Sequence, residues 1–262
     1  KEVLSSKESK LLKKNNSDLK VLNDVRVNME KALAKFITCE KLEMLYEKTF
    51  EKNSDDDSWL QRAAQLLRKK DCIDTDIYYR IAARQYELNP TSKSAFNMGV
   101  RSLKKDNYKK ALEYFSQAVD GETDNIKKAD YLFYLAKTYY SMGSKKNAKK
   151  YALEASINRR GWGAPFILIG DLYATSSREC GENTGKESDE FTKRVGYWAA
   201  IEKYKYAKKI DPSSKDVNKK IELYSKQMPD KTMTFNTITL QQETYTINCW
   251  YTETVKNPWY SN

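Results

Sequence analysis

Four cysteines carry the most distinctive chemistry in this chain: Cys39, Cys72, Cys180 and Cys249. None of them lies in a Cys-x-x-Cys pair, so the spacing of a zinc ribbon or a thioredoxin-type site is missing. An even number of cysteines without metal-ligand spacing indicates either buried thiols or two disulfides, and four cysteines permit three pairings. The sequence contains no histidine, which removes the usual general base, the usual metal ligand and the usual pH switch.

The other ionisable residues form no recognisable catalytic pattern. The sequence has no glycine-rich phosphate loop, and carboxylates such as Glu113 and Glu154 fall on expected helix surfaces, where they favour solubility. We therefore predict a protein that is not an enzyme, with no bound metal, no cofactor and no small-molecule substrate.

The chain is basic, with a formal net charge of +11 at pH 7. Such a charge suits acidic proteins, anionic lipid headgroups, anionic glycans or nucleic acid as partners, but lysines scattered along helix faces are more simply explained as a solvated surface. Lysine and tyrosine interleave in residues 108–115 and 204–209, a composition also found in nucleic-acid-binding segments. Because these tyrosines recur at repeat spacing, they are more simply explained as core residues, and we do not expect nucleic acid as the main partner.

Small residues recur at a fixed spacing through the middle of the chain. From Gly99 it is 12 residues to Ala111 and 7 more to Ala118, and the same two intervals follow Ala136. The 7-residue step recurs from Ala200 and is followed by a proline. This is the spacing of the tetratricopeptide repeat, in which small residues lie where two antiparallel helices touch. It predicts an all-α, right-handed helical solenoid of about five repeats.

The predicted organisation has three parts. Residues 1–16 are charged and polar, and we expect them to fray or to form a helical N-terminal segment. Residues 17–228 form the solenoid, with two degenerate repeats first, a polar loop insertion at about 176–191 and a capping helix at about 215–227. Residues 229–262 alternate threonine with aromatic and β-branched residues, which predicts a β-strand or hairpin tail docked on the helices.

Several segments are more specific than a generic helical repeat. They are WLQRAAQLLRKKDC, YELNPTSKSAFNMG, ILIGDLYATSS with an inserted CGEN, YWAAIEKYKYAKKIDPS, YSKQMP and YTINCWYTET. From about Lys31 onward the chain resembles a family of tetratricopeptide proteins of the Bacteroidota cell envelope, whose members end in a Cys-Trp-x-x-Glu-Thr motif. The chain departs from that family by closing with VKNPWYSN instead of continuing in threonine and arginine. The resemblance implies a repeat fold and a location, and it implies no particular chemistry.

The ends of the chain and its apolar runs bear on location. The sequence opens with Lys-Glu-Val, with no initiator methionine and no apolar signal region, which is typical of a mature or trimmed product. The longest apolar run, about 164–174, is too short to span a bilayer and contains Asp171. We predict no transmembrane segment and a periplasmic or outer-membrane-associated protein, with peripheral or lipid-anchored attachment left open.

Repeat spacing also favours one cysteine pairing. Cys39 and Cys72 are 33 residues apart, about one repeat, so both fall along the same edge of a solenoid. Packed helices lie roughly 8–10 Å apart and disulfide-bonded Cα atoms within about 7 Å, a gap that a small offset in the turn can close. Cys180, in the insertion, and Cys249, in the tail, each lie in a segment that needs anchoring. We predict disulfides Cys39–Cys72 and Cys180–Cys249, with buried free thiols as the alternative.

The repeat also predicts a binding surface. The first helix of each pair lines a concave groove that suits an extended peptide or an acidic tail, although the same residues can simply pack against neighbouring helices or the tail. The residues placed in the groove by repeat position are Asn97, Val100, Lys104, Phe133, Lys137, Tyr140, Ile167 and Asp171.

Together these features predict a non-enzymatic scaffold of the bacterial cell envelope. It would bind another envelope protein or complex through the groove, the insertion loop or the C-terminal tail. The alternative is a basic module that binds nucleic acid or another anionic polymer.

Overall fold

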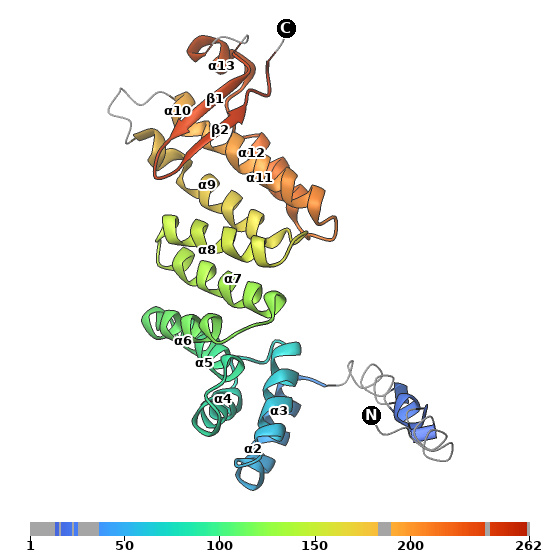
Figure 1. Ribbon diagram of the computed structural model, residues 1–262. Coiled ribbons are helices and arrows are strands. Elements are labelled where there is room, and N and C mark those ends of the chain that lie inside the picture. The colour runs from blue at the N-terminus through green and yellow to red at the C-terminus, as the bar shows by residue number, and fades with distance from the viewer. Residues whose placement is uncertain are drawn as a thin grey trace, which may run out of the picture. The chain divides into compact units, whose positions relative to one another are not determined.

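The computed structural model describes residues 14–15, 17–22, 24–25, 37–182, 190–238 and 242–260. The described chain is mostly helical, with a two-stranded antiparallel hairpin near its C-terminus (Figure 1). It forms two compact units, Lys1–Leu88 and Asn89–Asn262. The predicted 17–228 solenoid is therefore divided between the units, at the point where Pro90 stops helix propagation. Apart from residues 14–15, which are helical, the prediction for residues 1–16 lies outside the described residues.

Within the first unit, the helices α2 (Cys39–Asn53), α3 (Asp57–Lys69) and α4 (Asp76–Leu88) pack on one another. Thr38 and Asp56 cap the N-termini of α2 and α3, each through a side-chain oxygen that accepts a backbone N–H. The apolar stripes of the helices form the core, which includes Leu42, Phe50, Leu60, Leu67, Ile77 and Ile81. Cys39 and Cys72 are joined by a disulfide with their Cα atoms 5.3 Å apart, which ties the start of α2 to the turn after α3.

The second unit begins with consecutive helices joined by short turns. They are α5 (Ser92–Lys104), α6 (Tyr108–Asp120), α7 (Asn125–Ser141), α8 (Lys145–Asn158) and α9 (Ala164–Glu182), followed later by α11 (Gly196–Ile210). From α6 to α9 each helix packs on the one before it, and α11 packs on α9. Figure 1 shows the succession from α5 in green to α11 in orange.

The regularly spaced small residues lie where helices touch, as the sequence predicts. Ala111, Ala118, Ala136, Ala148, Ala155, Ala200 and Ala207 are all fully buried. A Cβ atom at Gly99 would come within 2.5 Å of the Phe115 ring, and one at Gly170 within 2.5 Å of the Tyr204 ring. Glycine at these two positions lets an aromatic ring of the paired helix lie directly against the helix backbone.

The predicted loop at 176–191 is wrong at every residue of this range that the structure describes. Helix α9 continues through Glu182, and a short helix, α10 (Glu190–Arg194), includes Phe191; residues 183–189 lie outside the description. The small side chains of this extension allow α10 to approach it closely. A Cβ atom at Gly181 would lie 2.5 Å from the backbone nitrogen of Lys193, and the Ser177 hydroxyl donates a 2.8 Å hydrogen bond to the Lys193 carbonyl.

The C-terminal part begins with α12 (Val217–Ser225), which packs on α11 and lies where the sequence predicts a helix at about 215–227. The next segment, predicted as β-rich, instead forms the helix α13 (Lys231–Thr237). Asp230 starts it, because its carboxylate accepts a 2.8 Å hydrogen bond from the Met233 N–H. The predicted hairpin follows as β1 (Thr244–Asn248) and β2 (Thr252–Lys256), and β2 packs against α11.

Candidate functional site

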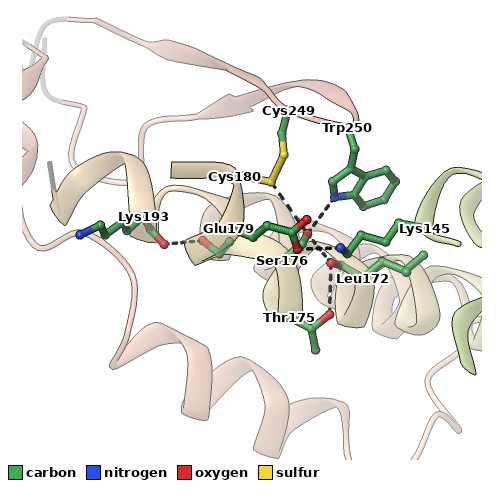
Figure 2. Close-up of a disulfide and its surroundings, with 10 residues drawn as sticks. Lys145, Leu172, Thr175, Ser176, Glu179, Cys180, Lys193, Cys249 and Trp250 are labelled. Atoms are coloured by element: carbon green, nitrogen blue, oxygen red, sulfur yellow. Dashed lines mark hydrogen bonds and ion pairs between the residues drawn. A yellow bond between two sulfur atoms is a disulfide. The ribbon is translucent and has the colours of Figure 1, made fainter. Parts of the chain in front are cut away.

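The turn between β1 and β2 is fixed to α9. Cys249, in the turn, forms a disulfide with Cys180 on α9, and their Cα atoms are 5.3 Å apart. The indole N–H of Trp250 donates a 2.9 Å hydrogen bond to the Ser176 hydroxyl, one helical turn earlier on α9. Figure 2 shows the disulfide and the Trp250 indole reaching α9 at adjacent positions. Both cysteine pairs in the structure are the pairs that the sequence predicts.

Aromatic rings continue this contact along α9. The Tyr251 ring stacks on Tyr173 with centroids 4.0 Å apart and planes 20° from parallel. Trp250 lies beside both, 5.8 Å from Tyr173 and 4.8 Å from Tyr251 between centroids. Tyr251 is buried, together with Ile247 and Val255 of the hairpin. The tail therefore buries one face against the helices, which supplies the docking surface that an isolated hairpin lacks.

Glu253 on β2 accepts from three helices at once. Its carboxylate receives a 2.6 Å hydrogen bond from the Tyr173 hydroxyl on α9 and a 2.5 Å contact from Lys203 Nζ on α11. Lys149 Nζ on α8 lies 3.6 Å away. Burial alone would raise the pKa of Glu253, but the hydrogen bonds from Lys203 and Tyr173 and the two lysine charges hold that pKa below its usual value. The carboxylate is thus kept ionised and fully engaged.

The same contacts shift the pKa values of the groups around Glu253. Burial, followed by the hydrogen bond to Glu253, raises the pKa of Tyr173 far above its usual value, so the phenol keeps its proton. Burial lowers the pKa of Lys149, and Glu253 opposes that shift. Lys149 Nζ also lies 5.2 Å from the Tyr173 ring centroid and 5.7 Å from that of Tyr251, where the ring faces favour a cation. The cluster joins the tail to the helices rather than exposing a reactive group.

Next to this joint lies an open depression of about 420 Å³. One wall is a face of α8 and the other is the hairpin turn. Its lining is mainly apolar with lysines at the edge: Lys146, Lys149, Lys150, Leu153, Glu154, Ile157, Trp250 and Tyr251. Leu153 is 38% exposed and Ile157 is 73% exposed, so two aliphatic side chains reach solvent beside three ammonium groups.

The structure changes the interpretation of the predicted groove. Asn97 and Val100 are buried, at 0% and 2% exposure, so assigning them to an open groove is wrong. They face the packed interior because α5 contacts α7 as well as α6. Phe133, Tyr140 and Ile167 are half-buried and pack against the core of the second unit, which is the alternative of packing against neighbouring helices.

The charged residues of the predicted groove fall into two places. Lys104 and Lys137 lie close enough for their charges to interact: partial burial of the Lys137 ammonium group, and then the Lys104 charge, lowers the pKa of Lys137. Asp171 is half-buried and accepts a 2.6 Å hydrogen bond from the Tyr204 hydroxyl and a 2.7 Å contact from Lys220 Nζ. Asp171 therefore braces α9 against α11 and α12.

Sequence reasoning missed the residues of the α8 depression. Their signal was available, because Lys146, Lys150, Leu153 and Ile157 recur at steps of three and four on one helix. Glu253 entered only as part of the motif that carries the family resemblance, with no role attached to it.

Two further properties of the described residues bear on function. No group of three or more cysteine, aspartate or glutamate side chains among them could hold a metal ion. No helix in the described ranges is both long and apolar enough to cross a membrane.

Comparison with known proteins adds no assignment: no protein-family model matches the sequence, and no curated protein is significantly similar to it.

Proposed function

We propose that the protein is an exported, non-enzymatic scaffold of the tetratricopeptide type that binds a partner protein in the bacterial cell envelope. The consecutive helix pairs of the second unit, with fully buried alanines at the repeat positions, support a repeat architecture. The family resemblance supports an envelope location and a Bacteroidota origin. A stack of such pairs exposes long helix faces to partners.

Export is supported by the cysteines. All four are paired, one pair in each compact unit. Disulfides persist in oxidising spaces such as the bacterial periplasm and are rare in the cytosol. The Cys180–Cys249 bond also holds the tail in place. Docking of the tail through this bond therefore requires an oxidising compartment.

The observation that carries partner binding is the α8 depression. Exposed Leu153 and Ile157 lie beside Trp250, a side chain that the disulfide-fixed turn holds in place. Exposed apolar side chains rimmed by polar ones mark protein interaction sites more often than single exposed residues do. The charged groups around Glu253, by contrast, are paired with one another: the Glu253 carboxylate contacts Lys149 and Lys203.

A second candidate function is binding of an anionic polymer. A separate depression of about 230 Å³ on α5 and α6 is lined by Arg101, Lys105 and Lys110, and the whole chain carries a charge of +11. Binding of a polyanion would weaken steeply with salt because it releases counterions. A contact that includes apolar burial would weaken less.

Affinity purification from the native envelope fraction tests the main proposal. Tagged protein, recovered at physiological and at high salt without reductant, should retain one protein partner in proportion to the bait at both salt concentrations. Recovery of nucleic acid or glycan that is lost at high salt, with no protein retained, would contradict it and favour the polymer-binding alternative.

A further inference from the structure

The α8 depression has the chemistry to select its occupant, and this inference rests on the proposed function. We propose that it binds an acidic segment of the partner protein, with one apolar side chain of that segment seated between Leu153, Ile157 and Trp250. Carboxylates of the same segment would lie against Lys146 and Lys150.

The arrangement on α8 sets the spacing of the groups that such a segment must carry. Lys146, Lys150, Leu153 and Ile157 follow one helix face, lysines first and aliphatic residues after. At 1.5 Å of rise per residue, Lys146 and Ile157 are separated by roughly 16 Å along the helix. An extended peptide covers that distance with about five residues. The matching segment therefore carries its carboxylates a few residues away from its apolar anchor.

Charge decides in favour of an acidic partner. Among the described residues Lys146 forms no ion pair, and it is exposed. Lys150 is also exposed, and within the part of the chain that the structure describes its ion pair is a long one, 3.9 Å from Glu154. Lys149 is committed to Glu253. Two ammonium groups are thus available to carboxylates from outside, while the single acidic side chain of the lining, Glu154, is outnumbered.

The second wall depends on the tail. Trp250 is positioned by its hydrogen bond to Ser176 and by the neighbouring Cys180–Cys249 bond (Figure 2). Reduction of that bond should therefore loosen the wall and weaken binding, although every residue of α8 remains in place. This links occupancy of the site to an oxidising compartment.

Fluorescence anisotropy with a short labelled peptide tests the inference on the full oxidised chain. The probe has consecutive glutamates followed by leucine and phenylalanine, and its control has glutamine in place of every glutamate. The probe should bind at least about tenfold more tightly than the control. Lys146→Glu with Lys150→Glu, or Ile157→Glu alone, should each weaken probe binding about tenfold.

Matched variants on other helices distinguish an effect of the α8 depression from a general effect of the protein's net charge. Leu223→Glu on α12 replaces an aliphatic residue that is 51% exposed, and Lys209→Glu reverses another exposed lysine; both should leave probe affinity within about twofold of wild type. All replaced residues are exposed, so an unchanged unfolding midpoint confirms that the variants fold. Absence of probe binding, or equal loss in the α8 and control variants, would overturn the inference.

Failure of the α8 site can be distinguished from failure of the proposed scaffold function. If a partner protein co-purifies equally well with wild type and with Ile157→Glu, the scaffold proposal stands and the α8 site is wrong. If no protein partner co-purifies at all, the scaffold proposal itself fails. Tighter binding of a double-stranded DNA or heparin probe than of the acidic peptide would also overturn the α8 assignment.

Discussion

Replacing Glu253 with glutamine removes one negative charge from the joint between the tail and the helices while keeping the side chain's shape. In the native protein the carboxylate contacts Tyr173, Lys203 and Lys149 at 2.6, 2.5 and 3.6 Å. Glu253 is only 20% exposed, and the two lysine side chains are 24% and 23% exposed. The substitution therefore leaves two largely covered ammonium groups without their counter-charge.

The expected loss of stability follows from these contacts. A hydrogen bond to a charged group contributes about 1.5–3 kcal/mol, and breaking a fully buried ion pair costs about 3–5 kcal/mol. Glutamine can still accept the Tyr173 hydrogen bond, and the remaining exposure of the lysines screens their charges. We expect Glu253→Gln to lower the free energy of unfolding by about 2–3 kcal/mol.

The effect should depend on pH with a defined sign. The folded-state pKa of Glu253 is lowered, so the carboxylate stabilises the fold fully above the unfolded-state pKa of glutamate, about 4.3. That contribution is lost as the pH falls through the folded-state pKa. The difference in stability between wild type and Glu253→Gln should hold near neutral pH and shrink below about pH 4.

Urea unfolding of the oxidised full chain, followed by circular dichroism at several pH values, measures this difference. Glu222→Gln is the matched control, because Glu222 pairs with Lys226 at 2.8 Å but both side chains are more than two-thirds exposed. It should leave the unfolding midpoint unchanged. The reasoning is refuted if the two variants behave alike, or if the loss in Glu253→Gln does not change on acidification.

Three further predictions concern the tail and the helix contacts. Replacing Cys180 and Cys249 with serine opens a link across 69 residues, which should cost about 4 kcal/mol in urea unfolding; an unchanged midpoint would show that the bond does not stabilise the fold. Gly170→Ala should destabilise by about 1–3 kcal/mol, since its Cβ would lie 2.5 Å from the Tyr204 ring; a gain in thermal stability would contradict this packing. Removing residues 230–262 should speed protease cleavage in the last turns of α9, and an unchanged cleavage rate would mean that helix and tail are independent.

The helix pairs of the second unit could be predicted from sequence because close helix packing needs small residues at fixed intervals. Gly99 lies under Phe115, and the buried alanines recur where the spacing places them. The same logic misjudged the residues after Ala174, where serine, cysteine and glycine were interpreted as loop composition. There the small polar residues are buried along a helix, because α10 and Trp250 contact it directly.

The candidate site was harder to predict for a physical reason. Repeat position identifies which helix a residue occupies, but it does not distinguish an open face from one covered by the next helix, as Asn97 shows. The Glu253 joint combines residues from α8, α9, α11 and β2. Contacts between such distant segments depend on how the tail docks, which no local pattern in the sequence encodes.

The Cys180–Cys249 disulfide ties the tail to α9, and the proposed export to an oxidising compartment rests on both disulfides. Non-reducing peptide mapping of protein from its native source, alkylated at lysis, tests them directly. We expect Cys39 joined to Cys72 and Cys180 joined to Cys249. Recovery of four alkylated free thiols would contradict the fixed tail and the exported location together.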